Sequence, residues 1–344
     1  MKVLYLTPWY PSNKDAMSGL FVQKHVEAVR AQGVDVRVIS SVTWRELLHE
    51  WCSFRKEGWL PDVVQLNVIQ KQGLLALWLK KHYSIPYIIV EHWSGYLPES
   101  GIFNTMPAFK NKLYKFIASQ ASVILTVSDR LEKAMKDCGI QNAHWGRINN
   151  VVDDFFFEEK PRIKDKKQKT LLHVSCFDEQ AKNVKSLLRA AKMLSEKRQD
   201  WRLVLVGTGV DYKEVHDYAE SLDIPDGLLQ WTGELQPKEV AEWMYKADAI
   251  VLSSRYETYG IILAEAVVTG LPVLSTPVGI AEEIADLIVP QEIVQNKPGR
   301  FAEFIETILW GKVKKSKSNG VKARFSPEII GKTLKGIYAE IQNL

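Results

Sequence analysis

The sequence predicts an α/β protein built from two doubly wound, Rossmann-like domains that face a cleft. Apolar, strand-like runs alternate with amphipathic helical segments along most of the chain, which is typical of parallel strands covered by helices on both faces. The alternation is broken once, over residues 149–170, by an acidic, aromatic and finally lysine-rich stretch that we interpret as a link between domains. A length of 344 residues is also enough for two domains that each bury a core.

The first domain is predicted over residues 1–155. A strand over residues 2–7 is followed by an amphipathic helix over residues 18–33, which Gly33 ends, and by a second strand over residues 34–40. This strand–helix–strand order is the unit from which parallel sheets are built. Further strand-like runs continue the pattern at residues 62–68, 85–92 and 122–128.

The second domain is predicted over residues 156–325, where the alternation restarts. The final stretch, residues 326–344, is predicted to be a helix that packs back on the first domain. Ser326 is its expected cap, and Pro327 takes its first helical position. The strand-like runs of this second half are residues 171–177, 202–209, 228–235, 247–254 and 271–277.

Composition narrows the class of protein. The net charge of +4 and the isoelectric point near 8.7 fit weak attraction to an anionic ligand or membrane surface, rather than the concentrated basic surface of a nucleic-acid binder. Cys52, Cys138 and Cys176 are widely spaced, so the sequence indicates neither a disulfide framework nor a zinc site. No signal-peptide pattern opens the chain, and no apolar run approaches the ~20 residues that span a bilayer. We therefore expect a cytoplasmic protein.

The stretch SSRYETYGIILAEAVVTGLPVLS, residues 253–275, carries the strongest functional signal. It reads as a strand end, a turn and a helix ended by Gly270, so the helix N-terminus lies at the sheet edge where ligands bind and offers a phosphate site. Glu257 and Glu265 flank these amides, and carboxylates accept hydrogen bonds from sugar hydroxyls. A nucleotide-sugar suits this layout; the alternative is that both glutamates are solvated charges on a helix surface.

These residues resemble the paired-glutamate motif of the retaining GT-B glycosyltransferases of family 4, the glycosyl transferases group 1. The resemblance spans nearly the whole chain, through SGLFV, KNVKSLLRAAK, LVLVGTG and the FSPE helix, but only the paired-glutamate segment is specific. It implies a GT-B architecture and a hexosyltransferase that retains the anomeric configuration. The matching motif residues are Glu257, Gly260, Glu265, Ala266, Gly270, Pro272 and Val273, followed by TPVGIAEEI.

The resemblance also implies roles for single residues. Glu257 would lie by the donor sugar, Glu265 would hold the ribose hydroxyls, and Lys182 would neutralise the diphosphate. Gly19 would allow the backbone to approach the diphosphate, and His92 would reach the donor sugar. His92, Lys182 and Glu257 are thus the catalytic candidates. The further donor-binding candidates are Thr258, Tyr259, Gly260 and Ile261 at the helix start, and Gly207 and Gly209, a tight turn interpreted as facing the base.

The chain departs from the family in two places. Relatives have an arginine where this chain has Cys176, six positions before Lys182, so one of two positive charges expected at the leaving group is missing. Another basic residue would have to replace it. The segment over residues 285–301 also lacks the usual loop on the far wall of the pocket. The GTG of Gly207 to Gly209 has no third glycine at the required spacing, which disfavours a dehydrogenase.

We therefore predict transfer of a hexose-type sugar from a nucleotide-diphosphate-sugar to a glycan or lipid-linked glycan acceptor, in cell-surface polysaccharide synthesis. No cofactor and no metal are expected, because the chain has no DxD pair and its His and Cys residues do not cluster as ligands. The helix N-terminus and Lys182 would stabilise the leaving diphosphate instead. Two alternatives stay open: a nucleotide-sugar epimerase of the same architecture, and a catalytically silent nucleotide-sugar-binding protein.

Aromatic residues at strand ends of the first domain are the candidates for acceptor binding. Trp9, Tyr10, Trp93 and Tyr96 fall in such loops, where their ring faces would stack on a glycan unless they belong to the core.

A helix over residues 108–120 is the candidate for peripheral membrane contact. Phe109, Leu113, Phe116 and Ile117 share one of its faces, with three lysines outside that face. This pattern suits either ordinary packing against the domain or weak contact with anionic lipid at the inner face of a membrane.

Overall fold

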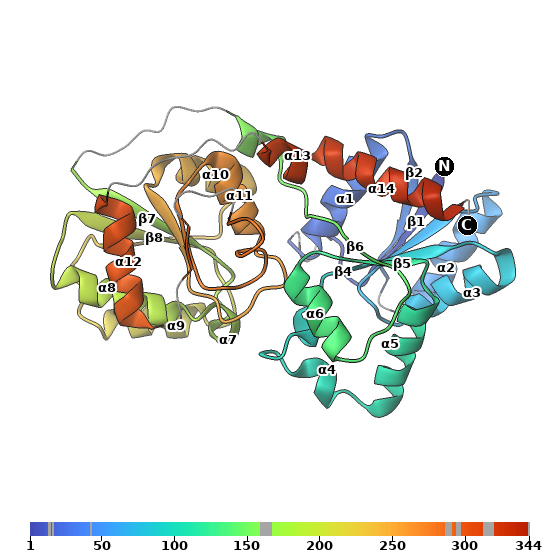
Figure 1. The fold of residues 1–344 in the computed structure, drawn as a ribbon, viewed down its shortest axis with the longest axis horizontal. Helices are drawn as coiled ribbons and strands as arrows, with labels where there is room; N and C mark the ends of the chain where they lie inside the picture. Colours follow the sequence, from blue (N-terminus) through green and yellow to red (C-terminus); the bar gives the residue numbers. More distant parts are fainter. Residues whose placement is uncertain are drawn as a thin grey trace. The chain divides into compact units, whose positions relative to one another are not determined.

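The computed structural model describes residues 1–12, 15, 17–41, 43–158, 167–285, 291–293, 297–311 and 320–342. They divide into two compact units, Met1–Val151 with Ala323–Leu344, and Val152–Lys322 (Figure 1). Each unit contains one parallel six-stranded sheet with helices, which confirms the predicted fold class. Residues 159–166 of the predicted link, and residues 286–290 and 294–296 of the divergent segment, lie outside the described residues.

The first unit is organised around a parallel sheet in the order β2-β1-β3-β4-β5-β6. Strands β3 and β4 are buried at every position, which explains why they read as continuous apolar runs rather than alternating ones. The strands are β1 (Lys2–Leu6), β2 (Asp35–Ile39), β3 (Val63–Asn67), β4 (Tyr87–Glu91), β5 (Val123–Thr126) and β6 (Trp145–Arg147). The helices are α1 (Leu20–Arg30), α2 (Trp44–Lys56), α3 (Gly73–Tyr83), η1 (Ser94–Tyr96), α4 (Ile102–Thr105), α5 (Ala108–Gln120), α6 (Asp129–Asp137) and α14 (Pro327–Gln342).

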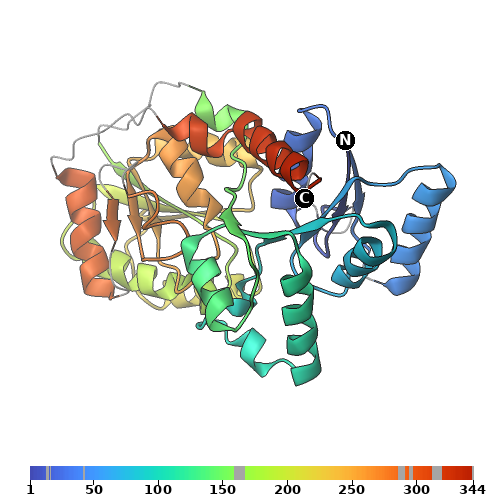
Figure 2. The same cartoon turned by 45° about the vertical axis from the view of Figure 1, so that its right-hand side comes forward.

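Helix α14 brings the end of the chain back to the first unit. Figure 1 and Figure 2 both show it lying along α1, and a Cβ added at Gly331 would stand 2.2 Å from the carbonyl oxygen of Ala28. Only glycine therefore permits so close an approach of the two helices. Tyr338 of α14 donates a hydrogen bond to the Gln65 side chain, and its hydroxyl lies 2.8 Å from that of Tyr5. The helix thus adds both apolar and polar contacts to the core of this unit.

The second unit repeats the architecture, with a parallel sheet in the order β12-β11-β10-β7-β8-β9. Its strands are β7 (Lys169–Val174), β8 (Trp201–Val206), β9 (Leu229–Gly233), β10 (Ala249–Leu252), β11 (Val273–Ser275) and β12 (Gln291–Ile293). Its helical segments are η2 (Asp154–Phe157), α7 (Glu179–Lys182), α8 (Val184–Ser195), α9 (Tyr212–Glu220), α10 (Pro237–Lys246), α11 (Ile261–Thr269) and α12 (Pro298–Trp310), and α13 (Val321–Phe325) spans the boundary between the units.

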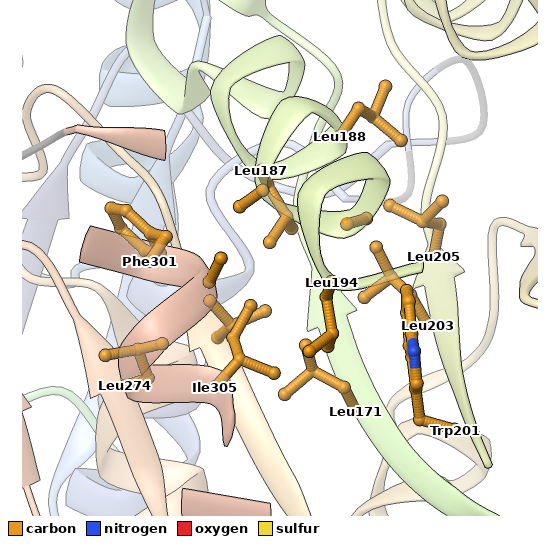
Figure 3. Close-up of a cluster of buried hydrophobic side chains, with 14 of the residues drawn as sticks. Leu171, Leu187, Leu188, Leu194, Trp201, Leu203, Leu205, Leu274, Phe301 and Ile305 are labelled. Atoms are coloured by element: carbon orange, nitrogen blue, oxygen red, sulfur yellow. The ribbon is translucent and has the colours of Figure 1, made fainter. Parts of the chain in front are cut away.

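Leucine is the commonest residue in the core of the second unit, which also contains Phe177, Trp201 and Phe301. Trp201 at the start of β8 is fully buried and packs among leucines of β7, β8 and α8 (Figure 3). Phe301 and Ile305 of α12 join the same cluster. Burying a side chain of this size removes a large apolar area from water, so this face of the sheet is firmly covered.

Both sheets have a switch point at which the strand order reverses direction. In the first unit β1 lies between β2 and β3, and in the second unit β7 lies between β8 and β10. Chains leaving the carboxyl ends of two such neighbouring strands turn to opposite faces of the sheet, which opens a crevice for a ligand. Ligand-binding residues are therefore expected in the loops after β1 and β3 and in those after β7 and β10.

The packing of α14 on α1 makes a prediction about stability. Leu334 is fully buried in that contact, so Leu334→Ala should lower the free energy of unfolding by roughly 2–5 kcal/mol. Ile329 lies on the same helix with 37% of its surface exposed, so Ile329→Ala should cost less than about 1 kcal/mol. Urea unfolding followed by circular dichroism measures both changes. Equal losses in the two variants would contradict the packing described.

Candidate functional site

An ion pair stands at the switch point of the second unit. The Nζ atom of Lys182, at the end of α7, lies 2.6 Å from Oε1 of Glu257, in the turn after β10. Ser254 donates a second hydrogen bond, of 2.8 Å, to the same carboxylate oxygen. The side chains of Lys182 and Glu257 are 15% and 14% exposed. Two residues 75 positions apart are thus joined where parallel sheets bind ligands.

The ion pair keeps Lys182 charged. Burial, the largest single influence, opposes its ammonium charge, but Glu257 together with Cys176 and Asp178 outweighs burial and raises the pKa of Lys182 above its ordinary value. An ammonium has three N–H donors, and Glu257 takes one of them. The lysine is therefore a fixed positive charge that can still bind an anion.

The backbone around Lys182 is fastened to the turn after β10. Ser253 donates a hydrogen bond of 2.9 Å to the Lys182 carbonyl oxygen, and Asn183 takes a left-handed conformation with φ of 51°. Arg255 donates from its guanidinium to Oδ1 of Asn183 at 2.6 Å and to the carbonyl of Gln180 at 3.1 Å. Arg255 is thus a brace between the two loops. Cys176, the position at which the family resemblance implies an arginine, is exposed.

Helix α11 begins beside this pair. Gly260, its N-cap, has φ of 75°, no side chain among the described residues caps the helix start, and the first turn holds no acidic residue. Tyr259 is buried, and its carbonyl oxygen accepts a hydrogen bond from the Ile280 amide at 2.9 Å. Thr258 and Ile261 complete the predicted stretch and are partly exposed. The helix N-terminus is therefore available to an anion, as its position at the sheet edge predicts.

Neither predicted glutamate is a solvated surface charge. Glu265 lies one turn inside α11 and is only 7% exposed, and Glu257 is held by Lys182 and Ser254. A carboxylate removed from water needs hydrogen-bonding or charged partners. The two glutamates therefore serve the local structure of this site and not the solubility of the protein.

The glycines of GTG have a structural reason of their own. A Cβ at Gly207, whose φ is 122°, would lie 1.9 Å from the carbonyl oxygen of Ser175, and one at Gly209 would lie 2.5 Å from the Phe177 nitrogen. The turn after β8 thus packs directly on the loop after β7.

Sequence reasoning missed His173, which lies on β7 and is 1% exposed. Its Nδ1 atom is 2.9 Å from the carbonyl oxygen of Val251, and its Nε2 atom is 2.9 Å from Oγ of Ser175. Burial lowers its pKa to about 4, so the ring is neutral at neutral pH. A histidine inside an apolar strand, two residues before a serine at the strand end, is the signal that could have revealed it.

In the first unit, Gly19 and His92 lie near the carboxyl edge of the sheet. Gly19 has φ of 66°, and a Cβ there would stand 2.3 Å from the Trp9 carbonyl, so the glycine is required by the chain's own loop. His92 is buried against Phe21, with ring centroids 4.3 Å apart, and burial lowers its pKa well below the ordinary value. Its Nε2 atom has no hydrogen-bond partner among the described residues.

A second residue that sequence reasoning missed is Glu91, the fully buried last residue of β4. Its carboxylate accepts backbone hydrogen bonds from Ile69 at 3.0 Å, His92 at 3.0 Å and Trp93 at 2.9 Å. Burial raises the pKa of Glu91 to about 7 against these three donors. The neighbouring Val68 has φ of 66°, a conformation that β-branched residues rarely adopt. Glu91 therefore holds together the loops that follow β3 and β4.

The four aromatic acceptor candidates are not equally accessible. Tyr96 is 2% exposed, and its ring lies between Trp93 and Phe103, at centroid distances of 5.1 and 5.0 Å. In this structure it belongs to the core. Trp9, Tyr10 and Trp93 are partly exposed.

Helix α5 meets both the core and the solvent with residues of the predicted apolar face. Ile117 is fully buried, whereas Phe109 and Phe116 are 68% and 54% exposed. The shared apolar face of the sequence pattern is thus divided between the core and the solvent. Within the described residues, no helix is long and apolar enough to cross a membrane.

A separate polar cluster lies on α9. His216, Asp217 and Glu220 have potential ligand atoms within 4.8 Å of one another, but Asp217 pairs with Lys213 at 2.6 Å and His216 packs on Trp231. A cavity of about 400 Å³ beside β9 is lined partly by His216 and Glu220. Neither feature includes Lys182 or Glu257.

A fixed lysine charge, a helix N-terminus, one buried carboxylate and one partly buried carboxylate at a switch point define a class of Rossmann-like site for a ligand with both phosphate and hydroxyl groups. Residues 154–324 match the family model described as Glycosyl transferases group 1. The matched residues lie almost entirely within the second unit, the unit that holds Lys182 and Glu257.

Curated relatives share this region at low identity. The chain is 26% identical over 239 residues to N-acetyl-alpha-D-glucosaminyl L-malate synthase of Bacillus anthracis, covering 63% of this chain and 60% of that protein. It is 25% identical over 283 residues to lipopolysaccharide 1,6-galactosyltransferase of Escherichia coli (strain K12), covering 76% and 74%. It is 24% identical over 244 residues to alpha-monoglucosyldiacylglycerol synthase of Streptococcus pneumoniae, covering 64% and 54%. The chain thus spans less than two thirds of the first and the last of these proteins.

Solved structures share the fold over the whole chain. Alr3699/HepE of Anabaena, in complex with UDP-glucose, superposes with a TM-score of 0.76 at 17% identity, covering 99% of this chain and all of that one. The apo form of the lipopolysaccharide outer core galactosyltransferase WaaB gives a TM-score of 0.69 at 18% identity, covering 99% and 100%. The two parallel α/β domains are therefore those of the GT-B fold.

Buried neutral histidines predict sensitivity to acid. Burial lowers the pKa of His25 from 6.5 to about 4, and its Nε2 atom lies 3.0 Å from the Asn149 carbonyl oxygen. A folded-state pKa below the unfolded one gives stability that is present above pH 6.5 and is lost as the pH falls toward 4. When the pH is lowered from 7 to 5, the free energy of unfolding should therefore fall by roughly 2 kcal/mol less in His25→Gln than in the parent.

Urea unfolding at the two pH values measures this difference. His49→Gln, which changes an exposed histidine of the same unit, is the matched control and should follow the parent. Parallel pH profiles for His25→Gln and the parent would show that His25 is not a buried neutral base.

Proposed function

We propose that this protein is a glycosyltransferase that moves a hexose-type sugar from a nucleotide-diphosphate-sugar to a glycan or lipid-linked glycan acceptor, in cell-surface polysaccharide synthesis. The observation that carries the proposal is the partly buried pair of Lys182 and Glu257, 2.6 Å apart, at the switch point of the unit that matches the glycosyl transferases group 1 model. The UDP-glucose bound by the Anabaena structure and the sugar-transferring names of the relatives support a donor of this class.

The donor diphosphate would lie between Lys182 and the N-terminus of α11. The ammonium and the helix amides would stabilise the charge that develops on the leaving group, and they are preorganised because the loops are braced. Glu265 would hold the ribose hydroxyls and Glu257 the donor sugar, while Gly207 and Gly209 would shape the turn beside the base. Gly19 and His92 of the first unit remain donor-binding candidates on the family resemblance alone, and the lowered pKa of His92 would make it a neutral hydrogen-bonding group.

The reaction would proceed with retention at the anomeric carbon. The acceptor hydroxyl would attack on the face from which the diphosphate leaves, and a diphosphate oxygen would take its proton. Trp9, Tyr10 and Trp93 are the acceptor candidates with exposed surface. The positive charge comes from protein groups in this scheme, so turnover should survive excess EDTA. Complete, metal-restorable loss of activity would contradict it.

The two alternatives differ from a transferase in their products. An epimerase would isomerise the donor without an acceptor, and a silent binding protein would leave the donor unchanged. The named relatives do not favour either one. Incubation with a panel of nucleotide-sugars, followed by separate assays for free nucleotide, isomerised donor and binding, distinguishes all three.

The leading prediction concerns Lys182. Lys182→Ala should lower kcat about 100-fold or more while changing nucleoside diphosphate affinity less, because the leaving group gains charge only as the bond breaks. Lys185→Ala is the matched control, since it removes the same charge from a partly exposed lysine that pairs with Glu214. Turnover and calorimetric binding of UDP measure the two effects. Turnover equal to that of the parent, in a folded Lys182→Ala protein, would show that another group holds the diphosphate.

We also propose that α5 makes peripheral contact with an anionic membrane at the cytoplasmic face. Phe109 and Phe116 are exposed on α5. The helix has no acidic residue and carries three lysines, Lys110, Lys112 and Lys115. Exposed aromatic rings flanked by cations fit an interface of acyl chains and anionic headgroups. An acceptor linked to lipid would lie in the same surface.

The membrane proposal predicts an effect of removing both rings. Phe109→Ala with Phe116→Ala should weaken binding to vesicles of phosphatidylglycerol and phosphatidylcholine by at least about tenfold, since each buried ring is worth roughly 1.5–3 kcal/mol. Co-sedimentation measures this, with Met193→Ala, another exposed apolar residue, as the control. Undiminished binding by the double variant would overturn the proposal.

A further inference from the structure

We infer that the Ser175 hydroxyl binds the nucleotide-sugar donor only as a hydrogen-bond acceptor, and that it recognises a sugar hydroxyl rather than a phosphate oxygen. Ser175 follows the last residue of β7, on the strand that forms one side of the switch point. It is partly exposed, whereas His173 behind it is buried. The inference rests on the proposed function and adds a specificity-determining residue to it.

The direction of the Ser175 hydroxyl follows from two contacts of His173. A carbonyl oxygen can only accept, so the 2.9 Å contact between Nδ1 of His173 and the Val251 oxygen places the ring proton on Nδ1. In a neutral imidazole the other nitrogen, Nε2, is then an acceptor. In the 2.9 Å contact between Nε2 of His173 and Oγ of Ser175, the serine hydroxyl must therefore donate its proton to Nε2.

This arrangement is held by burial. Turning the Ser175 proton toward a ligand would leave the Nε2 atom of His173 unsatisfied inside the protein, which is costly. The neutral state of the ring is itself set by burial, which lowers the pKa of His173 to about 4. Ser175 thus presents only lone pairs outward throughout the neutral pH range.

Lone pairs repel phosphate oxygens and attract hydroxyl donors. His173 bonds to the Val251 carbonyl of β10, and Ser253, two residues further on, donates to the Lys182 carbonyl, so Ser175 lies at the same edge of the sheet as Lys182. The ammonium and the helix amides would take the diphosphate, and Ser175 would take a hydroxyl of the ribose or of the transferred sugar. These two sources share one chemistry, and affinity measurements separate them.

The first experiment compares Ser175→Ala with the parent by calorimetry, using UDP, pyrophosphate and a panel of UDP-glucose, GDP-mannose and ADP-glucose. The loss of one hydroxyl contact should weaken binding of the preferred nucleotide-sugar about tenfold and leave pyrophosphate unchanged. An equal loss for the free nucleotide assigns the ribose hydroxyl, and a loss confined to the nucleotide-sugar assigns the transferred sugar; both support the inference. Ser221→Ala is the matched control, since its hydroxyl donates to the Tyr218 carbonyl at the end of α9.

Two results would overturn the inference. Unchanged affinity of Ser175→Ala for a nucleotide-sugar that the parent binds removes the ligand assignment while leaving the proposed function intact. Weaker pyrophosphate binding shows that the hydroxyl donates to phosphate. If the parent binds no member of the panel, the proposed function fails, and the ligand assignment fails with it.

A second experiment tests the hydroxyl direction without any ligand. Nitrogen NMR of the His173 ring should show a proton on Nδ1 and an accepting Nε2, and the Nε2 resonance should shift in Ser175→Ala. A proton on Nε2 in the parent would overturn the inference whatever the binding data show.

Discussion

All pairings between the described strands are parallel, and this constraint organises both units. Parallel sheets are covered by helices on both faces, so most side chains of their strands are buried and apolar. Polar functional residues therefore lie mainly at the strand ends. The carboxyl ends of neighbouring strands meet at one edge, and the loops that leave β7 and β10 there bring Lys182 to Glu257. The site is thus a consequence of topology as much as of the residues themselves.

The ion pair of Lys182 and Glu257 shows how charges that are partly removed from water are stabilised. Removing Lys182 and Glu257 partly from solvent is costly, and the short contact, the Ser254 hydroxyl and the braced backbone repay part of that cost. A pair of this kind contributes little to net stability but fixes geometry before a ligand arrives. In the first unit, Glu91 fixes two loops by accepting three amides instead of a cation.

The architecture and part of the site could be predicted from the sequence, for physical reasons. Buried parallel strands read as apolar runs, and the turn before α11 follows one of them directly. The contacts of His173 with Val251 and of Glu91 with Ile69 could not be predicted, because each joins segments that are distant in sequence. In α5 the helical period shows that Phe116 and Ile117 are neighbours on one face, but not which of them meets the core. The glycines Gly19 and Gly207 reflect close contacts of the chain with itself, which no local pattern reveals.

The return of α14 has a consequence for the order in which the protein is made. The core of the first unit joins Val22 and Val26 of α1 to Leu334 and Ile341, residues separated by more than three hundred positions. Domains generally fold as they emerge from the ribosome, N-terminal parts first. Here the first unit must wait, with one face of α1 uncovered, until Ile341 has been synthesised. The second unit is continuous in sequence and can complete its fold earlier. The unit whose synthesis begins first is therefore the last to complete its fold.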